Sequence, residues 1–301
     1  MNGPVYTVDD LLGRCVFPVA GTAVDCAVSG GADSTALLVL AVAAGLDVTC
    51  WTVNHGLRAS SAAEAQLVES TARSLGVPVV VVEALVVDGP DLEQRARDAR
   101  RAVLPDKVLT GHTADDQAET VLLNLLRGAG VPGTAGIGEP ARRPLLALRR
   151  TETSGLCEVL GMEVVDDPSN VDPRFTRNRI RHEVLPLLAD VTSRDPVPLL
   201  TRHATLAGEA TRLLVGLAAE VDPTDVHSVA ETPDDLVRMA LRQWLIKCVA
   251  ECSADRLSGP PPDSASVNRV LQVVRGRVVA AEVAGGHRVR RSAGRLVFEP
   301  R

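Results

Sequence analysis

A glycine turn between a strand and a helix constrains the fold of this chain more than any other feature of its sequence. An apolar run at 24–28 is followed by Ser29-Gly30-Gly31-Ala32-Asp33-Ser34, and a helix-forming stretch occupies 35–44. Such a turn directs successive backbone N–H groups and a helix N-terminus at one point, which suits a phosphate group. Glycine at both positions permits positive φ and close approach of a ligand. The turn predicts a nucleotide site; an ordinary turn that starts a helix is the alternative.

The residues after the glycines distinguish this turn from a kinase-type phosphate loop. That loop has Lys followed by Ser or Thr after its second glycine, whereas Asp33 and Ser34 stand here. An Asp beside phosphate oxygens is best explained by a bridging divalent cation, because Mg²⁺ is typically bound by one or two carboxylates together with substrate phosphates. We therefore expect Asp33 to bind Mg²⁺ on the phosphates of a nucleotide.

Apolar runs alternate with helical patterns through the first half of the chain. Strands are expected at 47–54, 77–87 and 107–110, and helices at 61–75, 91–103 and 115–127. This alternation indicates an α/β fold with a parallel sheet and helices on both faces. Ligands of such sheets bind beyond the carboxyl ends of the strands. Three polar loops, 29–34, 54–58 and 111–116, follow strands at that edge, and we expect them to converge there.

The third loop concentrates chemistry-bearing side chains where a strand meets a helix. It contains His112, Asp115 and Asp116. In the alternative interpretation, the two carboxylates only cap the helix and interact favourably with its dipole. This explains one of the carboxylates more easily than both. We expect one of these two carboxylates to join Asp33 in binding Mg²⁺. His112 is expected to contact nucleotide or substrate, although a lone histidine is more often structural.

The second loop supplies two candidate contacts to a nucleic acid, His55 and Arg58. Arg58 would reach a phosphate of the nucleotide or of a nucleic-acid backbone. A solvated surface arginine is the alternative, and the loop taken alone is a weak signal.

An arginine-rich segment at 166–183 contrasts with the acidic character of the whole chain. The formal net charge of −6 argues against a generally basic nucleic-acid binder. Arg174, Arg177 and Arg181 follow helical spacing and would line one helix face, which suits phosphates of RNA or ATP. A solvated face paired with the acidic side chains at 166, 167 and 183 explains the same spacing equally well.

The pattern changes beyond about residue 190. Prolines at 196 and 198 predict a break, and amphipathic patterns predict helices at 199–221 and 234–252. The Ser-, Gly- and Pro-containing stretch 253–266 is typical of a flexible linker. Alternating runs between 277 and 298 predict a hairpin. We therefore expect an α/β domain at 1–190, a smaller, mostly helical domain at 191–252, a linker at 253–266 and a terminal β-hairpin region at 267–301.

The cysteines and the apolar runs suggest a cytoplasmic protein without a membrane anchor. No C-x-x-C pair occurs, so buried free thiols are expected rather than a metal site. No apolar run is long enough to span a bilayer, and the N-terminus lacks a basic segment followed by an apolar one. The cysteines are Cys15, Cys26, Cys50, Cys157, Cys248 and Cys252.

Taken in order, these motifs resemble those of the tRNA(Ile)-lysidine synthetases, a family of N-type ATP pyrophosphatases. The segments that carry the resemblance are 29–34, 55–58, 111–128, 144–146, 177–181 and 185–188. Together they cover about the first 190 residues, and the last third resembles the family's C-terminal part only generically. The chain is shorter than many members, so we expect it to lack a second C-terminal domain.

The resemblance implies an ATP- and Mg²⁺-dependent ligase. Such enzymes adenylate the C2 oxygen of the cytidine at the first anticodon position of an isoleucine tRNA, whose anticodon is CAU. The ε-amine of L-lysine then displaces AMP, which leaves lysidine. The resemblance assigns the pyrophosphate to residues 29–34, the metal to Asp33 and Asp116, phosphate contacts to Arg179 and Arg181, and the lysine amine to Asp115.

Two other functions stay open at this point. A tRNA 2-thiocytidine synthetase shares the ATP loop but relies on cysteines, and the lack of a C-x-x-C pair argues against it. An ATP-binding sensor without chemistry would release no pyrophosphate in the presence of tRNA and lysine. A homodimer is compatible with the sequence, which carries no signal for an oligomeric state.

Overall fold

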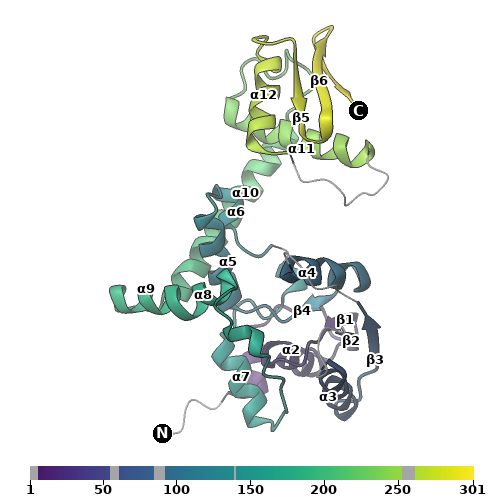
Figure 1. The fold of residues 1–301 in the computed structure, drawn as a ribbon, viewed down its shortest axis with the longest axis vertical. Coiled ribbons are helices and arrows are strands. Elements are labelled where there is room, and N and C mark those ends of the chain that lie inside the picture. The colour runs from purple at the N-terminus through teal and green to yellow at the C-terminus, as the bar shows by residue number, and fades with distance from the viewer. Residues whose placement is uncertain (1–5, 55–60, 85–91, 139, 253–261) are drawn as a thin grey trace. The chain divides into compact units, whose positions relative to one another are not determined.

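Four parallel strands form the centre of the first of two structural units. The computed structural model describes residues 6–54, 61–84, 92–138, 140–252 and 262–301, and the chain divides into Met1–Ala207 and Gly208–Arg301. The strands β1 (Ala23–Ala27), β2 (Asp47–Asn54), β3 (Val79–Glu83) and β4 (Leu109–Thr110) pair in the order β3-β2-β1-β4 (Figure 1). The predicted α/β fold with a parallel sheet is confirmed.

Helices connect consecutive strands of this sheet. α2 (Ala32–Ala43) and α3 (Ser61–Ser74) follow β1 and β2, and α4 (Leu92–Val103) leads from β3 to β4. The strand order reverses at this last connection, so right-handed crossovers place α2 and α3 on one face and α4 on the other (Figure 1). The reversal puts β4 beside β1 and makes the edge between them a topological switch point, where ligands of such sheets bind.

The core of the first unit surrounds α2. This helix is apolar nearly all round because it lies between the sheet and α7 (Arg150–Val159). Leu37, Leu38 and Leu40 are fully buried, and Leu11 of α1 (Val8–Leu12) joins the same core. Each such side chain contributes roughly 1.5–3 kcal/mol on burial, so the position of the α2 N-terminus is firmly set.

The predicted boundaries differ from those observed at three elements. α2 begins at Ala32 rather than at residue 35, which places Asp33 and Ser34 in its first turn. β3 is confined to Val79–Glu83, because the N–H of Val77 donates to the carbonyl of Ala72 at the end of α3. Residues 85–87 lie outside the described part of the chain. β4 is only two residues long, because the N–H of Val108 bonds back to Pro105 in a turn.

Short helices complete the first unit after β4. α5 (Ala114–Leu126) is followed by α6 (Val131–Thr134) and two 3₁₀ turns, η1 (Pro140–Arg142) and η2 (Pro168–Val171), the second of which follows α7. The expected arginine helix is divided into α8 (Thr176–Arg179), the π-helical turn η3 (Ile180–Val184) and α9 (Leu185–Thr192). Arg174 precedes α8, whose N-cap is Phe175, so it does not share a continuous helix with the later arginines.

The two prolines near residue 197 begin a helix instead of breaking the chain. α10 (Pro196–Ala219) contains both in its first turn. A residue there has no intrahelical partner for its N–H, so proline costs little. The N–H of Val197 donates to Asp195 Oδ1 at 3.0 Å, which caps the helix. The boundary between the two units falls within α10.

The second unit combines helices with an antiparallel sheet. α11 (Asp234–Cys252) and α12 (Ser264–Val274) share an apolar core with β5 (Ala280–Val283), β6 (His287–Ser292) and β7 (Arg295–Glu299), which pair in that order; the 3₁₀ turn η4 (Ala284–Gly286) joins the first two strands. The expected hairpin is thus part of a three-stranded sheet. Residues 253–261 of the expected linker lie outside the described residues, whereas 264–266 begin α12, because Asp263 accepts the N–H of Ser266 at 2.7 Å as an N-cap.

The cysteines and the helices bear on two further expectations. All six cysteines are free, and Cys26, Cys50 and Cys157 are buried as expected. Cys15 and Cys248 are only partly buried, and Cys252, the last residue of α11, is exposed, contrary to the expectation. No helix in the described part of the chain is long and apolar enough to cross a membrane.

Candidate active site

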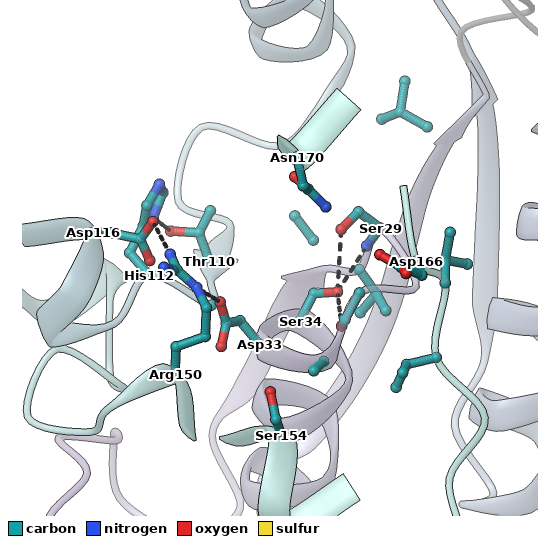
Figure 2. A pocket seen from close by; sticks show the side chains of 18 of the residues that line it. Ser29, Asp33, Ser34, Thr110, His112, Asp116, Arg150, Ser154, Asp166 and Asn170 are labelled. Atoms are coloured by element: carbon teal, nitrogen blue, oxygen red, sulfur yellow. Dashed lines mark hydrogen bonds and ion pairs between the residues drawn. The ribbon is translucent and has the colours of Figure 1, made fainter. Parts of the chain in front are cut away.

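A cavity of about 850 Å³ opens at the carboxyl ends of β1 and β4. The first and third polar loops of the sequence meet there, as predicted (Figure 2). The second loop, with His55 and Arg58, lies outside the described residues. The lining from these two loops and the adjacent helices comprises Ser29, Gly31, Ala32, Asp33, Ser34, Thr110, Gly111, His112, Asp116, Arg150 and Ser154.

The glycine loop is shaped as an anion site. Ser34 Oγ accepts the N–H of Ser29 at 3.1 Å and donates to the carbonyl of Gly31 at 2.9 Å, which ties the loop to the first turn of α2. Gly31 is the N-cap of α2 and has no side chain to bind the N–H groups of that turn. A Cβ placed on Gly31 would meet nothing closer than Ser29 Oγ at 3.9 Å. The space in front of the helix N-terminus can therefore accept a phosphate.

A segment after α7 packs over the other glycine. Gly30 has φ +86°, and its carbonyl accepts the N–H of Val165 at 2.9 Å. A Cβ on Gly30 would come within 2.7 Å of Val165 Cγ2. Both the backbone conformation and this close approach require glycine. The segment then brings Asp166 and Asn170 to the cavity near Ser29 (Figure 2).

The third loop is pressed against the first. A Cβ on Gly111 would lie 2.6 Å from the carbonyl oxygen of Asp33, so only glycine permits this approach. The contact places His112 and Asp116 on the same cavity as Asp33. His112 Nδ1 lies 2.8 Å from Thr110 Oγ1, which orients the ring.

Arg150, the first residue of α7, lies between the two carboxylates predicted to bind metal. Its Nε is 3.3 Å from Asp33 Oδ2 and its Nη2 is 2.9 Å from Asp116 Oδ1 (Figure 2). Thr153, one turn further along α7, donates to the other oxygen of Asp33. Sequence reasoning missed Arg150, although it lies just beyond the segment 144–146 that carried part of the family resemblance.

A fully buried carboxylate, Glu119, holds the arginines of this region together. It accepts from Arg177 Nε at 2.7 Å, from Arg181 Nε at 2.7 Å and from Arg150 Nη1 at 3.1 Å. A buried charge persists only when it is paired, which explains why three guanidinium groups converge on it. Arg181 also lines the cavity. Sequence reasoning missed Glu119, whose signal is its position one helical turn after Asp115 and Asp116.

The two candidate metal ligands have pKa values displaced in opposite directions. Burial raises the pKa of Asp33, and its bonds with Thr153 and Arg150 offset this only in part. Burial acts in the same sense on Asp116, but the charges of Arg150 and Arg177 outweigh it and lower its pKa. Neighbouring carboxylates in different protonation environments are typical of functional sites.

Asp115 does not line the cavity. Its carboxylate accepts from Arg149 Nη2 at 3.0 Å and from the backbone N–H of Arg150 at 2.8 Å. Burial opposes ionisation, but these bonds lower the pKa of Asp115. The side chain thus ties the start of α5 to the start of α7, the helix that carries Arg150.

The remaining predicted arginines lie on the surface. Arg174 is paired with Asp172 at 2.6 Å, and Arg179 with Glu183 at 2.9 Å. Neither lines the cavity. Arg58 lies outside the described residues; of the described arginines expected at phosphates, only Arg181 reaches the cavity, and Arg177 is bound to Glu119 and Asp116 beside it.

A parallel sheet with a glycine loop at its switch point and an acidic residue after it defines a PP-loop ATP-binding protein. Residues 7–188 match the ATP-binding family described as the PP-loop domain. The chain resembles the U34-tRNA thiolase NcsA from Methanococcus maripaludis in fold, with a TM-score of 0.54 and 18% identity over 67% of this chain and 77% of that one.

Sequence relatives narrow this class. The chain is 41% identical to the tRNA(Ile)-lysidine synthase of Rhodococcus erythropolis (strain PR4 / NBRC 100887) over 76% of each protein. It is 42% identical to that of Mycobacterium leprae (strain TN), over 78% of this chain and 80% of the relative. The chain belongs to the tRNA(Ile)-lysidine synthase family.

Proposed function

We propose that this chain joins L-lysine to C2 of the cytidine at the first anticodon position of tRNA(Ile), with cleavage of ATP to AMP and pyrophosphate. The observation that carries the proposal is the meeting of the glycine loop, Asp33 and Asp116 on one cavity in a chain 41% identical to a tRNA(Ile)-lysidine synthase. The substrate is the isoleucine tRNA with a CAU anticodon.

ATP is expected to bind with its phosphates on the glycine loop. The N–H groups at the start of α2 offer donors for the pyrophosphate, and the positive end of the helix dipole favours its charge. Val28, Trp51 and Val53 also line the cavity and supply an apolar wall for the base. Loop and wall together suit a nucleotide better than a free phosphate.

The donor set of the cavity fits Mg²⁺. Asp33 and Asp116 present carboxylate oxygens a short distance apart, each within 3.3 Å of the same guanidinium. In the described residues no three His, Cys, Asp or Glu side chains group as a complete site, so phosphate oxygens would supply the other ligands, as is usual for Mg²⁺. When bound, Mg²⁺ neutralises charge on the phosphates during cleavage.

The reaction balances without any other cofactor. The C2 oxygen of cytidine attacks the α-phosphorus of ATP, and pyrophosphate leaves. The lysine ε-amine then attacks C2, and AMP leaves with the former C2 oxygen. His112 faces the cavity and is proposed to contact the nucleotide or the base. Contacts with RNA are predicted for four further residues: His55, Arg58, Arg174 and Arg177.

The structure also bears on the two rival functions. A thiocytidine synthetase needs cysteines at its reaction centre, and none of the described residues that line the cavity is a cysteine. An ATP sensor would not need the second carboxylate beside Asp33. The ligase therefore explains more of the site than either rival.

Incubation with ATP, Mg²⁺, radiolabelled lysine and bulk tRNA tests the proposal. We expect label in the tRNA fraction and one AMP per lysine incorporated. Asp33→Asn should reduce incorporation by on the order of a hundred-fold or more while the protein stays folded. Asp47→Asn, an exposed carboxylate at the opposite end of the sheet, is the matched control. Absence of label with the wild-type protein would refute the ligase.

A further inference from the structure

The most unusual feature of the site is a cation that the protein supplies itself. Arg150 is the only described arginine that contacts Asp33, and the same guanidinium reaches Asp116 and Glu119. Its side chain is 26% exposed, so one edge faces the cavity. The guanidinium therefore lies where the two proposed metal ligands converge.

The charges of the ion-pair cluster around Arg150 are balanced. Three carboxylates, Asp33, Asp116 and Glu119, face three guanidinium groups, Arg150, Arg177 and Arg181. A divalent cation added alone would lie against Arg150. A polyphosphate added alone would lie against the two aspartates. Neither addition is favourable in a partly dehydrated cavity, whereas the two together nearly cancel.

Arg150 can leave the carboxylates at a lower cost than the other two arginines. Glu119 is fully buried and would still be paired with Arg177 and Arg181 through Nε bonds of 2.7 Å. The same two residues also lie within 4 Å of Asp116. Only Asp33 would lose its sole arginine, and Asp33 belongs to the glycine loop at 29–34.

We propose that Arg150 is a displaceable counter-ion of the metal site. It bridges Asp33 and Asp116 when no metal is bound, and it moves onto the polyphosphate when the metal and ATP enter together. Metal binding is therefore conditional on nucleotide. The inference rests on the proposed ATP–Mg²⁺ site and assigns Arg150 a positioning role within it.

Binding of Mn²⁺, measured by electron paramagnetic resonance without nucleotide, tests the proposal. Mn²⁺ prefers the same carboxylate ligands as Mg²⁺. A neighbouring guanidinium weakens proton binding by a carboxylate by about ten- to a thousand-fold, and it repels a metal cation by the same electrostatic effect. Arg150→Gln should therefore bind Mn²⁺ tighter than wild type by on the order of ten-fold or more. Wild type should reach comparable affinity only with ATP present. Arg174→Gln is the control, because this exposed arginine pairs with Asp172 and does not line the cavity.

Two further variants keep the test decisive. Asp33→Asn combined with Arg150→Gln should lose the gained affinity. If circular dichroism shows that Arg150→Gln is unfolded, Arg150→Lys replaces it in the test. Lysine keeps the charge but cannot bridge both carboxylates, so this variant should bind Mn²⁺ more tightly than wild type. The proposal would be overturned if the folded Arg150 variants bound Mn²⁺ no more tightly than wild type. It would also be overturned if wild type bound Mn²⁺ equally well with and without ATP. A protein that shows this metal behaviour but makes no lysidine would overturn only the proposed function.

Discussion

The guanidinium of Arg181 lies with its Nε 2.7 Å from the buried carboxylate of Glu119. An arginine whose spacing suggested phosphate binding is thus held at the cavity wall by an ion pair. Arg177 makes the same contact from the preceding turn. Together they attach α8 and the π-helical turn to α5, which places one wall of the cavity.

Replacement of Glu119 should destabilise the protein strongly. Glu119→Gln leaves three guanidinium groups around a neutral side chain. Removal of one partner of a buried ion pair lowers the free energy of unfolding by about 3–5 kcal/mol. Urea unfolding followed by circular dichroism measures the change. Glu158→Gln, an exposed residue of α7, is the control and should change stability little. A loss below about 1 kcal/mol for Glu119→Gln would show that the buried network does not hold the site together.

The two glycines of the loop should respond differently to alanine. Gly30→Ala forces a side chain into a left-handed conformation and against Val165, so the free energy of unfolding should fall by at least about 1–2 kcal/mol. Gly31→Ala has an ordinary φ of −71° and open space around its Cβ, so its stability loss should stay below about 1 kcal/mol. The added methyl group of Gly31→Ala would instead occupy the phosphate position and raise the KM for ATP. Equal effects of the two variants on stability would contradict this description of the loop.

Asp115→Asn separates two roles for this carboxylate. The resemblance predicts an orienting contact with the lysine amine, in which case the KM for lysine should rise with the stability unchanged. The observed bonds with Arg149 and with the N–H of Arg150 predict a different result, a loss of on the order of 1–3 kcal/mol in stability and a lower kcat. Steady-state kinetics with lysine as the varied substrate, together with urea unfolding, decides between them.

Glu152 should contribute stability that depends on pH. Burial would raise the pKa of this carboxyl, but its bonds with Arg14 and with the N–H of Arg149 lower it. A carboxyl with a lowered pKa in the folded state stabilises the protein above its unfolded pKa of about 4.3, and this contribution is lost as pH falls through the folded value. Glu152→Gln should thus cost about 1 kcal/mol at neutral pH, since Arg14 is 45% exposed and water screens the pair. The difference from wild type should shrink below about pH 4; a difference independent of pH would contradict the ion pair.

The choice of Asp116 over Asp115 came from the family resemblance, but local patterns were sufficient to predict the sheet, the glycine loop and the convergence of Asp33 with the loop at 111–116. Each depends on residues close together in the sequence, and the topology of parallel strands brings their ends to one edge. Sequence separation explains the residues that were missed. Arg150 is 117 residues from Asp33, and Arg181 is 62 residues from Glu119. No periodicity within one helix reports a contact at that distance.

The second unit shows a different limit. The start of α12 was interpreted as linker because Ser, Asp and Pro precede it, yet Asp263 is its N-cap. Polar residues of this kind are common to loops and to helix starts. The apolar positions Val267, Val270 and Leu271 mark the helix, but only their packing against the sheet distinguishes it from a loop.

Lysidine formation can be read directly by mass spectrometry of the anticodon nucleosides of unmodified tRNA(Ile) after reaction with ATP, Mg²⁺ and lysine. We expect the cytidine at the first anticodon position to gain the mass of lysine less one water, with one AMP formed per modified base, and methionine tRNA with the same anticodon to stay unmodified. An unchanged cytidine, or one that has gained sulfur when a sulfur donor is supplied, would contradict the proposed function.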